Sequence, residues 1–341
     1  MKKFFSIILV LAILAAIAGA VIYNKIWGVN VADAQEEYTF TIREGMTIEE
    51  VSTELLDQGI LIDKANFEQV AKWMKYDQTI KPGRFKAKKN WSNRSLISAL
   101  RSGVQSPVSV TFNSLRTVED LSGRITRNIQ VDSLSFLAYI TDTNTLQKYG
   151  KTRENILSLF TPNTYEAFWN TSVESLVKRM HKETDKFWNA TRLEKAKSLN
   201  LSPEEVYTLA SIVEKETLVK KEKPRIAGVY INRLKRGMLL QADPTVVFAV
   251  GDFGIRRVLN KHLAYDSPYN TYKYSGLPPG PIFMPDIGTI DAVLNYEKHD
   301  YIFFCAKPDN SGLHAFAKNN SGHAKNANKY RAWLNKRGIK K

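Results

Sequence analysis

The segment from Val206 to Thr217 carries two acids within an apolar pattern typical of a buried helix. At about 100° per residue, its apolar residues gather on one arc: Val206, Leu209, Ile212 and Val213. Glu216 returns to that arc, whereas Glu214 falls toward its edge, where we expect a solvated acid. Burial raises the pKa of a carboxyl group, and one that keeps its proton near neutral pH can act as a general acid. The segment therefore indicates an enzyme, with Glu216 as its candidate acid.

The elements predicted around this helix are mostly helical before it and irregular after it. Residues 130–200 are predicted to be mostly helical. A further helix is expected from Pro224 to Gly237, because proline favours the first helical turn and glycine the position after the last. Beyond Met238 we expect loops and short strands. The features predicted there are turns at Asp243-Pro244, Ser267-Pro268 and Gly276 to Pro281, a buried strand at Tyr301 to Phe304, and a basic helical end at Lys325 to Lys341.

Residues 38–104 read as a small α+β module. Alternation from Tyr38 to Ile42 predicts a strand, and Thr47 with Glu50 forms the T-x-x-E pattern of a helical capping box. The later elements predicted in this module are a helix at Phe67 to Trp73, a turn and short strand at Lys81 to Phe85, and a helix at Ser95 to Leu100. Beyond the module, Val108 to Phe112 alternates as another strand, and Thr117 opens another helix.

The N-terminus predicts a transmembrane signal anchor over residues 1–23, followed by a polar connector over 24–37. Phe4 to Tyr23 runs without a charge, which is long enough for a helix to cross a bilayer core of about 30 Å. A cleaved signal peptide is the alternative, because Ala32-Asp33-Ala34 resembles a cleavage site, although it lies well beyond the apolar run. Two lysines before the span place the N-terminus in the cytoplasm and the rest of the chain outside it.

Composition limits the classes of partner. The chain has 341 residues, 24% of them charged, and a formal net charge of +15. Such a surplus favours polyanions such as nucleic acid, anionic lipid or an acidic cell-wall polymer, and an extracytoplasmic location argues against nucleic acid. The single cysteine, Cys305, cannot form a disulfide within the chain. Because no Cys/His cluster has zinc spacing and no Gly-rich phosphate loop occurs, we expect neither a metal nor a cofactor.

Several strings, in this order, resemble the endolytic murein transglycosylase family. They are Leu209 to Thr217 (LASIVEKET), Ile231 to Leu234 (INRL), Leu240 to Val246 (LQADPTV), Tyr269 to Tyr272 (YNTY), Gly276 to Gly280 (GLPPG), and His314-Ala-Phe316 followed by His323. The resemblance implies a membrane anchor, a LysM-like module over residues 38–104 and a mixed α/β catalytic domain over residues 105–341. Two positions depart from the family pattern. Asn163 and Gly322 stand where acids are usual, and neither receives a role.

The resemblance also implies the reaction, which is cleavage of the MurNAc–GlcNAc β-1,4 bond within nascent glycan strands without water. One acid protonates the glycosidic oxygen and then accepts a proton from the C6 hydroxyl of MurNAc, giving a 1,6-anhydro end. The family's glutamate maps onto Glu216, the residue that the helical spacing indicates independently. A solvated acid, or one paired with Lys220, is the structural alternative.

Further site residues are expected in the loops that follow. Gln241 and Asp243 are expected to bind sugar or orient Glu216, although Asp243 also suits an Asx turn or helix cap. Asn270 and Tyr272 suit hydrogen bonding to sugar and stacking, or a purely structural loop. His314 is expected in the cleft, with a satisfied structural histidine as the alternative.

Two other functions stay open at this point. A peptidoglycan hydrolase would use Asp243 as a second carboxylate and leave reducing ends. A non-catalytic wall-binding protein would rely on the LysM-like module alone. Under the favoured function the partners are glycan strands and the cytoplasmic (inner) membrane, with the chain spanning it once. Penicillin-binding proteins of the elongation machinery are plausible partners, and nucleic acid is not expected.

Overall fold

Residues 2–337 are described by the computed structural model, in which two units are distinguished. Unit 1 extends to Ser109 and includes residues 128–130 and 166–171. Unit 2 holds the remaining residues. The acid-bearing segment from Val206 to Thr217 lies in unit 2.

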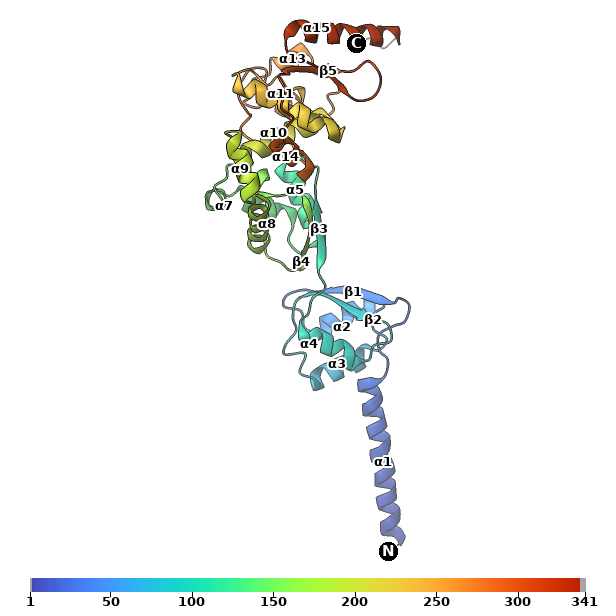
Figure 1. Ribbon diagram of the computed structural model, residues 1–341. Helices are drawn as coiled ribbons and strands as arrows, with labels where there is room; N and C mark the ends of the chain where they lie inside the picture. The colour runs from blue at the N-terminus through green and yellow to red at the C-terminus, as the bar shows by residue number, and fades with distance from the viewer. Residues whose placement is uncertain (1, 338–341) are drawn as a thin grey trace. The chain divides into compact units, whose positions relative to one another are not determined.

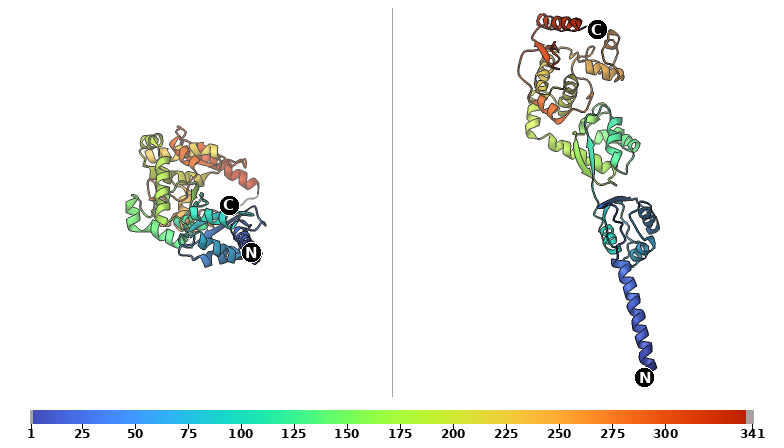
Figure 2. Two further views of the ribbon diagram at one scale, coloured as in Figure 1. Left: turned by 90° about the horizontal axis from the view of Figure 1, so that it is seen from below. Right: turned by 90° about the vertical axis from the view of Figure 1, so that its right-hand side faces the viewer.

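Unit 1 begins with α1 (Lys2–Trp27), a single helix whose apolar side chains are exposed. The right-hand view of Figure 2 shows it as one uninterrupted helix. Its stretch Lys3–Trp27 is long and apolar enough to cross a membrane. The helix was predicted from the charge-free run and continues four residues beyond the predicted end at Tyr23.

The rest of unit 1 is a two-stranded sheet covered by three helices on one face (Figure 1). Strand β1 (Glu37–Ile42) pairs antiparallel with β2 (Gly83–Lys88), and their inward residues include Phe40 opposite Phe85. The helices are α2 (Ile48–Asp57), α3 (Lys64–Trp73) and α4 (Asn93–Ser102). The predicted order of strand, two helices, strand and helix is confirmed.

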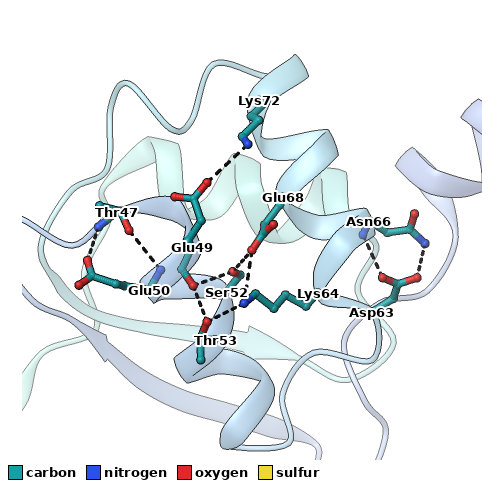
Figure 3. A network of polar contacts seen from close by, with 10 residues as sticks. All are labelled: Thr47, Glu49, Glu50, Ser52, Thr53, Asp63, Lys64, Asn66, Glu68 and Lys72. Carbon is teal, nitrogen blue, oxygen red and sulfur yellow. Dashed lines mark hydrogen bonds and ion pairs between the residues drawn. The ribbon is translucent and has the colours of Figure 1, made fainter.

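Local signals account for the helix ends in unit 1. The Thr47 hydroxyl accepts from Glu50 N, and the Glu50 carboxylate accepts from Thr47 N at 2.7 Å, which completes the predicted capping box (Figure 3). Helix α4 ends at Gly103, whose φ of +71° suits glycine. Between α2 and α3, Ser52 donates to Glu68 and Lys72 pairs with Glu49 at 3.5 Å (Figure 3). The Lys72–Glu49 pair is exposed, so the apolar core rather than this pair stabilises the unit.

Part of the expected connector over residues 24–37 packs into unit 1. Residues 24–27 continue α1, and Asn30 and Val31 are buried. The Asn30 amide donates to Asn93 Oδ1 at 2.7 Å, and Val31 forms an isolated bridge with Leu61. This segment therefore contributes side chains to the core of the unit.

The boundary between the units passes through the paired strands β3 (Val108–Phe112) and β4 (Asn163–Ala167). The helical elements between these strands are α5 (Val118–Ile125), η1 (Thr126–Asn128), α6 (Ser133–Thr141), α7 (Thr143–Lys148) and η2 (Ile156–Leu159). Strand β4 is followed by two helices, α8 (Val173–Phe187) and α9 (Ala190–Ser198). Residues 130–200 are thus mostly helical, as predicted, but β4 interrupts them. Tyr165 of β4 stacks on Phe112 of β3 at 5.3 Å, a contact that helical periodicity cannot reveal.

Helix α10 (Pro203–Glu216) lies at the centre of unit 2, in contact with α11 (Lys223–Lys235), α12 (Asp243–Val250) and α14 (Ile287–Leu294). The eight residues from Val206 to Val213 are all buried. The single buried arc expected from the sequence is therefore wrong, because neighbouring helices surround α10. The predicted end of the next helix is confirmed near Gly237, which has a φ of +63°.

The expectation of loops and short strands after Met238 is wrong in several places. Helices α12, α13 (Asn260–Leu263) and α14 lie there, and Asp243-Pro244 opens α12 rather than forming a turn. Proline is compatible with the first helical turn, and the mostly apolar residues that follow pack against α10. Strand β5 (Phe303–Ala306) begins two residues after the predicted strand and is half-buried.

Strand β5 pairs antiparallel with β6 (His314–Ala317), which the sequence did not predict, and α15 (Asn320–Lys336) contacts both (Figure 1). The basic helical end was expected to begin at Lys325, and α15 begins earlier, with Asn319 as its N-cap. Residues 338–341 of that prediction lie outside the described part of the chain.

Candidate active site

Glu216 is the last residue of α10, and its carboxylate is held by a tyrosine of the next long helix. The Tyr230 hydroxyl on α11 donates to Glu216 Oε1 at 2.5 Å. Tyr230 is itself buried and packs edge-on against Phe304 of β5, at 6.0 Å between ring centroids. Tyr230 was not identified from the sequence. The spacing of Tyr230 from Glu216 along the sequence does not predict their contact, because the two residues lie on different helices.

The surroundings of Glu216 keep a proton on its carboxyl group near neutral pH. Burial, and to a smaller extent the charge of Asp243, raise the pKa of Glu216 to about 7. The Tyr230 hydrogen bond and the Arg233 guanidinium act in the opposite direction. Burial also raises the pKa of Tyr230 well above its usual range, so this hydroxyl stays a donor at neutral pH. The site can therefore hold one carboxyl group that both releases and accepts a proton.

Glu216 lines three hollows of unit 2. We call the first the Tyr272 hollow, of about 430 Å³, which Tyr230, Gln241 and Tyr272 also line. The second is the basic hollow, of about 690 Å³, lined by Arg116, Lys215, Arg256 and Arg257 among others. The third is the His314 hollow, of about 490 Å³, which includes His314, Tyr330 and Trp333. An acid shared by three such spaces is placed to meet a ligand that extends in several directions.

Two of the predicted site residues, Asp243 and Tyr272, contact each other at the N-terminal end of α12. Asp243 is exposed at the start of the helix and lines both the Tyr272 hollow and the basic hollow. Its Oδ1 accepts from the Tyr272 hydroxyl at 2.6 Å. The preceding Ala242, not Asp243, is the N-cap, so the helix-cap alternative does not describe Asp243. The interaction with Tyr272 leaves Asp243 beside Glu216 as a second charged group.

Gln241 is held in an uncommon backbone conformation at the same place. Its φ is +49°, in the left-handed region that costs a residue with a side chain about 1–2 kcal/mol. Its backbone N–H donates to Thr271 O at 3.0 Å, and its side-chain oxygen accepts from Arg233 at 3.3 Å. Arg233 also donates to Ile302 O at 2.7 Å and is buried. Arg233 therefore positions the segment that brings Gln241 into the Tyr272 hollow.

Asn270 is placed differently from Tyr272. Its side chain is fully buried, and its amide donates to Leu263 O at 2.9 Å and Tyr265 O at 2.7 Å. Its oxygen accepts from Tyr272 N at 3.0 Å. These three bonds favour the structural alternative, in which Asn270 shapes the loop that presents Tyr272.

The two histidines near the end of the chain also differ. His314 lines its hollow, but its Nδ1 lies 2.9 Å from the buried carboxylate of Glu222, which also accepts from His314 N. This agrees with a structurally satisfied histidine at the edge of the cleft. His323 of α15 lines the Tyr272 hollow and stacks on Phe303 at 5.1 Å. Burial, together with the charges of Arg233 and Arg331, lowers the pKa of His323.

Glu214 is not the solvated acid that the sequence indicated. Its carboxylate accepts from Lys223 at 2.8 Å and from the hydroxyl of Thr289, and only 13% of its side chain is exposed. The phase argument failed because α11 and α14 cover the edge of α10 on which Glu214 lies. Glu214 joins these helices and does not line the three hollows around Glu216.

Comparisons with known proteins show the family to which the chain belongs. The model of the YceG-like family matches residues 40–329. An endolytic murein transglycosylase of Bacillus subtilis is 41% identical over 161 residues, which cover 47% of this chain and 44% of the relative. One of Streptococcus pneumoniae is 29% identical over 327 residues, covering 86% of this chain and 58% of the relative. The chain therefore spans about half of the length of the curated relatives it matches.

A solved structure gives the same result for the fold. The crystal structure of a YceG-like protein from Listeria monocytogenes matches with a TM-score of 0.57 and 28% identity. The match covers 85% of this chain and 98% of that one. The resemblance inferred from the sequence motifs is thus confirmed at the level of the family, and the chain belongs to the YceG-like family.

Proposed function

We propose that this protein is a lytic transglycosylase, a lyase that cleaves MurNAc–GlcNAc β-1,4 bonds within nascent peptidoglycan strands and leaves 1,6-anhydro-MurNAc ends. The observation that carries the proposal is a single carboxyl group, Glu216, with its pKa raised to about 7 where three hollows adjoin it. The names of the relatives support the substrate class, because each is an endolytic murein transglycosylase. Cleavage within strands would limit their length.

The proposed reaction uses one carboxyl group twice. Protonated Glu216 gives its proton to the glycosidic oxygen, and the bond from MurNAc C1 to that oxygen breaks. The resulting carboxylate then accepts the proton of the MurNAc C6 hydroxyl as O6 bonds to C1. Protons balance without water, and Glu216 returns to its protonated form. A pKa of about 7 suits both steps, because neither protonation state is strongly disfavoured at neutral pH.

The neighbours of Glu216 support this cycle. Tyr230 donates to Oε1, which stabilises the carboxylate after the first proton transfer and fixes the orientation of the group. Tyr272 and Gln241 offer polar atoms and an aromatic ring in the Tyr272 hollow, as sugar-binding sites require. Asp243 adds negative charge, which favours the oxocarbenium-like transition state as well as the protonated form of Glu216.

A two-carboxylate hydrolase is the second candidate function. The observation in its favour is that Asp243 lines two hollows together with Glu216. In that case Asp243 would act as nucleophile or base, water would enter the reaction, and the products would carry reducing ends. The chemistry of the new chain ends therefore separates the two functions.

We place the reaction outside the cytoplasm, next to the membrane. Helix α1 would anchor the chain as a single span, with the two lysines before it on the cytoplasmic side. Unit 1 beyond the anchor would serve as a LysM-like module that holds glycan. Glycan strands are then the main partner, and strand-synthesising penicillin-binding proteins are a second one.

The test uses the full chain in detergent with purified uncrosslinked peptidoglycan strands. Wild type, Glu216→Gln and a matched control, Glu194→Gln, are incubated with the strands, and chain ends are identified by mass spectrometry. Glu194 is an exposed acid on α9 with no hydrogen bond or ion pair among the described residues. Wild type and Glu194→Gln should give anhydro ends, and Glu216→Gln should give none.

Other outcomes redirect the proposal. Reducing ends from the wild type would select the hydrolase. Binding of strands without cleavage by the folded wild type would instead favour a wall-binding protein. Anhydro ends from Glu216→Gln at the wild-type rate would exclude Glu216 as the acid.

A further inference from the structure

The basic hollow differs from the two other hollows at Glu216 in its charge. Its lining cations are Arg116, Lys215, Arg256 and Arg257, and its lining acids are Glu216 and Asp243. Both acids are already assigned to the reacting bond. Four cations therefore surround a space with no other acid to balance them.

These four cations are unpaired within residues 2–337, since none forms an ion pair or a side-chain hydrogen bond there. Arg116 lies over the Phe253 ring at 4.4 Å, and Lys215 lies over the Phe283 ring at 4.6 Å. Burial and the nearby charge of Arg116 both lower the pKa of Lys215, which indicates that these two cations repel each other. A cluster of cations in which none is held in an ion pair favours the binding of an anion.

The two other hollows lack this feature. In the Tyr272 hollow the lining cation Arg233 is already bonded to the backbone oxygens of Leu240 and Ile302 and to Gln241. The His314 hollow has one lining lysine, Lys307. Of the three spaces next to Glu216, only the basic hollow is thus lined by several cations without ion-pair partners among the described residues.

The proposed reaction says which part of a strand lies closest to that space. The MurNAc ring must sit at Glu216, because its own C6 hydroxyl gives its proton there. The same ring carries the stem peptide on its 3-O-lactyl group, and stem peptides carry free carboxylates. At about 690 Å³, the basic hollow is also the largest of the three and is within the range of pockets that hold ligands of this size.

We propose that the basic hollow binds the carboxylates of the stem peptide on the MurNAc residue at the cleavage site, so that the protein selects peptide-bearing strands. This inference rests on the proposed function, since that function places MurNAc at Glu216. Arginine is suited to the task because its planar group binds carboxylates with two parallel hydrogen bonds. Arg256 and Arg257 are exposed and can meet an incoming peptide.

The test measures binding without turnover, in full-length protein that carries Glu216→Gln. Two ligands are compared by fluorescence anisotropy. One is labelled uncrosslinked strands with native stem peptides, and the other is the same strands after their carboxyl groups have been converted to carboxamides. The variant is Arg256→Gln/Arg257→Gln. The matched control is Arg124→Gln/Arg127→Gln, which removes the same charge from exposed arginines of unit 2 that line none of the three hollows.

We expect Arg256→Gln/Arg257→Gln to raise the Kd for native strands by roughly fivefold to twentyfold, the effect of two partly screened charge contacts. With native strands, the Kd of the control should stay within about twofold of the Kd of the parent protein. With amidated strands, the Kd of both double variants should also stay within about twofold of the parent's. Arg256→Lys/Arg257→Lys, which keeps the charge, should retain most of the affinity. Circular dichroism checks that each variant is folded.

Three results would overturn the inference. They are an unchanged Kd for native strands, an equal loss with amidated strands, and an equal loss in the control, which would indicate net charge alone. The result does not depend on catalysis. If the wild type cleaves no strand, the proposed function fails while the carboxylate-dependent binding is still measured.

Discussion

The two acids at the end of α10 lie two residues apart in opposite surroundings. Glu214 faces α11 and α14, where Lys223 and Thr289 satisfy its carboxylate. Glu216 faces three hollows, bonds to the neutral hydroxyl of Tyr230, and has its pKa raised to about 7. The Glu214 region uses charge to hold helices together, whereas the Glu216 region keeps a proton available.

This difference shows that burial by itself does not make an acid reactive. Both side chains are largely removed from water, but only one has a lysine within hydrogen-bonding distance. A paired buried carboxylate stays ionised, whereas one that meets only a neutral donor holds its proton more tightly. Substitutions at the two acids and at their partners test this contrast.

Replacement of Glu216 should have the largest effect on activity. Glu216→Gln keeps the size of the side chain and an acceptor for Tyr230 but cannot exchange a proton. We expect kcat to fall by about 10³-fold on uncrosslinked strands, with folding intact. Quantified anhydro ends give the rate. A loss of less than tenfold would mean that another group acts as the acid.

Removal of the partner of Glu214 should instead affect stability. Lys223→Met leaves the Glu214 carboxylate buried without its cation and should cost about 3 kcal/mol in the free energy of unfolding. Urea denaturation measures the loss, and activity per folded molecule should stay within about threefold. Lys235→Met, an exposed change on the same helix, is the control. Loss of activity without loss of stability would contradict the structural role assigned to the Lys223–Glu214 pair.

The stability of the wild type should depend on pH because of Glu216. A carboxyl group whose pKa is about 7 when folded and about 4.5 when unfolded binds more protons in the folded state between these values. Its contribution to stability is therefore fully present below pH 4.5 and is lost as the pH rises through 7, by about 3 kcal/mol in all. Glu216→Gln should abolish this part of the pH dependence. Unfolding curves at pH 5 and pH 8 measure the free energy of unfolding at each pH. An equal change in this free energy between the two pH values in the wild type and in Glu216→Gln would contradict the raised pKa.

Tyr230→Phe should shift the pH profile rather than remove activity. The lost hydrogen bond no longer favours the carboxylate, so the pKa of Glu216 should rise and the alkaline limb of kcat/KM should move up by about 1 pH unit. Tyr207→Phe is the control, because that hydroxyl donates to Phe160 O, away from Glu216. A limb that moves to lower pH would reverse the assigned role of Tyr230.

Asp243→Asn should have the smallest effect under the transglycosylase proposal. The negative charge of Asp243 raises the pKa of Glu216. Removal of that charge should therefore move the alkaline limb of the kcat/KM profile to lower pH, by roughly 0.3–0.5 pH units. Activity should stay within about tenfold of the wild type. A loss as large as that of Glu216→Gln, together with reducing ends from the wild type, would instead identify Asp243 as a catalytic carboxylate of a hydrolase.

The sequence predicted best what depends on neighbouring residues. The Thr47–Glu50 capping box, the end of α4 at Gly103, the strand at Tyr38 and the apolar α1 all follow from patterns a few residues long. Glu216 was indicated by helical phase as well as by motif. The proline at Pro244 was misjudged because the same residue type begins a turn or a helix, and only the following apolar residues packed against α10 decide between them.

The rest of the site depends on contacts between distant residues. Glu214 accepts from Thr289, which is 75 positions away in the sequence. Tyr230 reaches Glu216 only because α10 and α11 pack together. Neither the Glu214–Thr289 contact nor the Tyr230–Glu216 contact has a local sequence signal, so Glu214 was expected in solvent and Tyr230 was not identified.

The amino-acid sequence by itself determined the membrane-spanning length of α1, the local capping of most helices and the presence of an acid at the end of an apolar helix. Tertiary structure decided which of two acids keeps its proton and which bonds to a lysine. It also gathered four arginine and lysine side chains on one side of Glu216. The physical reason is that a pKa depends on desolvation and on the charges within a few ångströms, and those surroundings come from elements far apart along the chain.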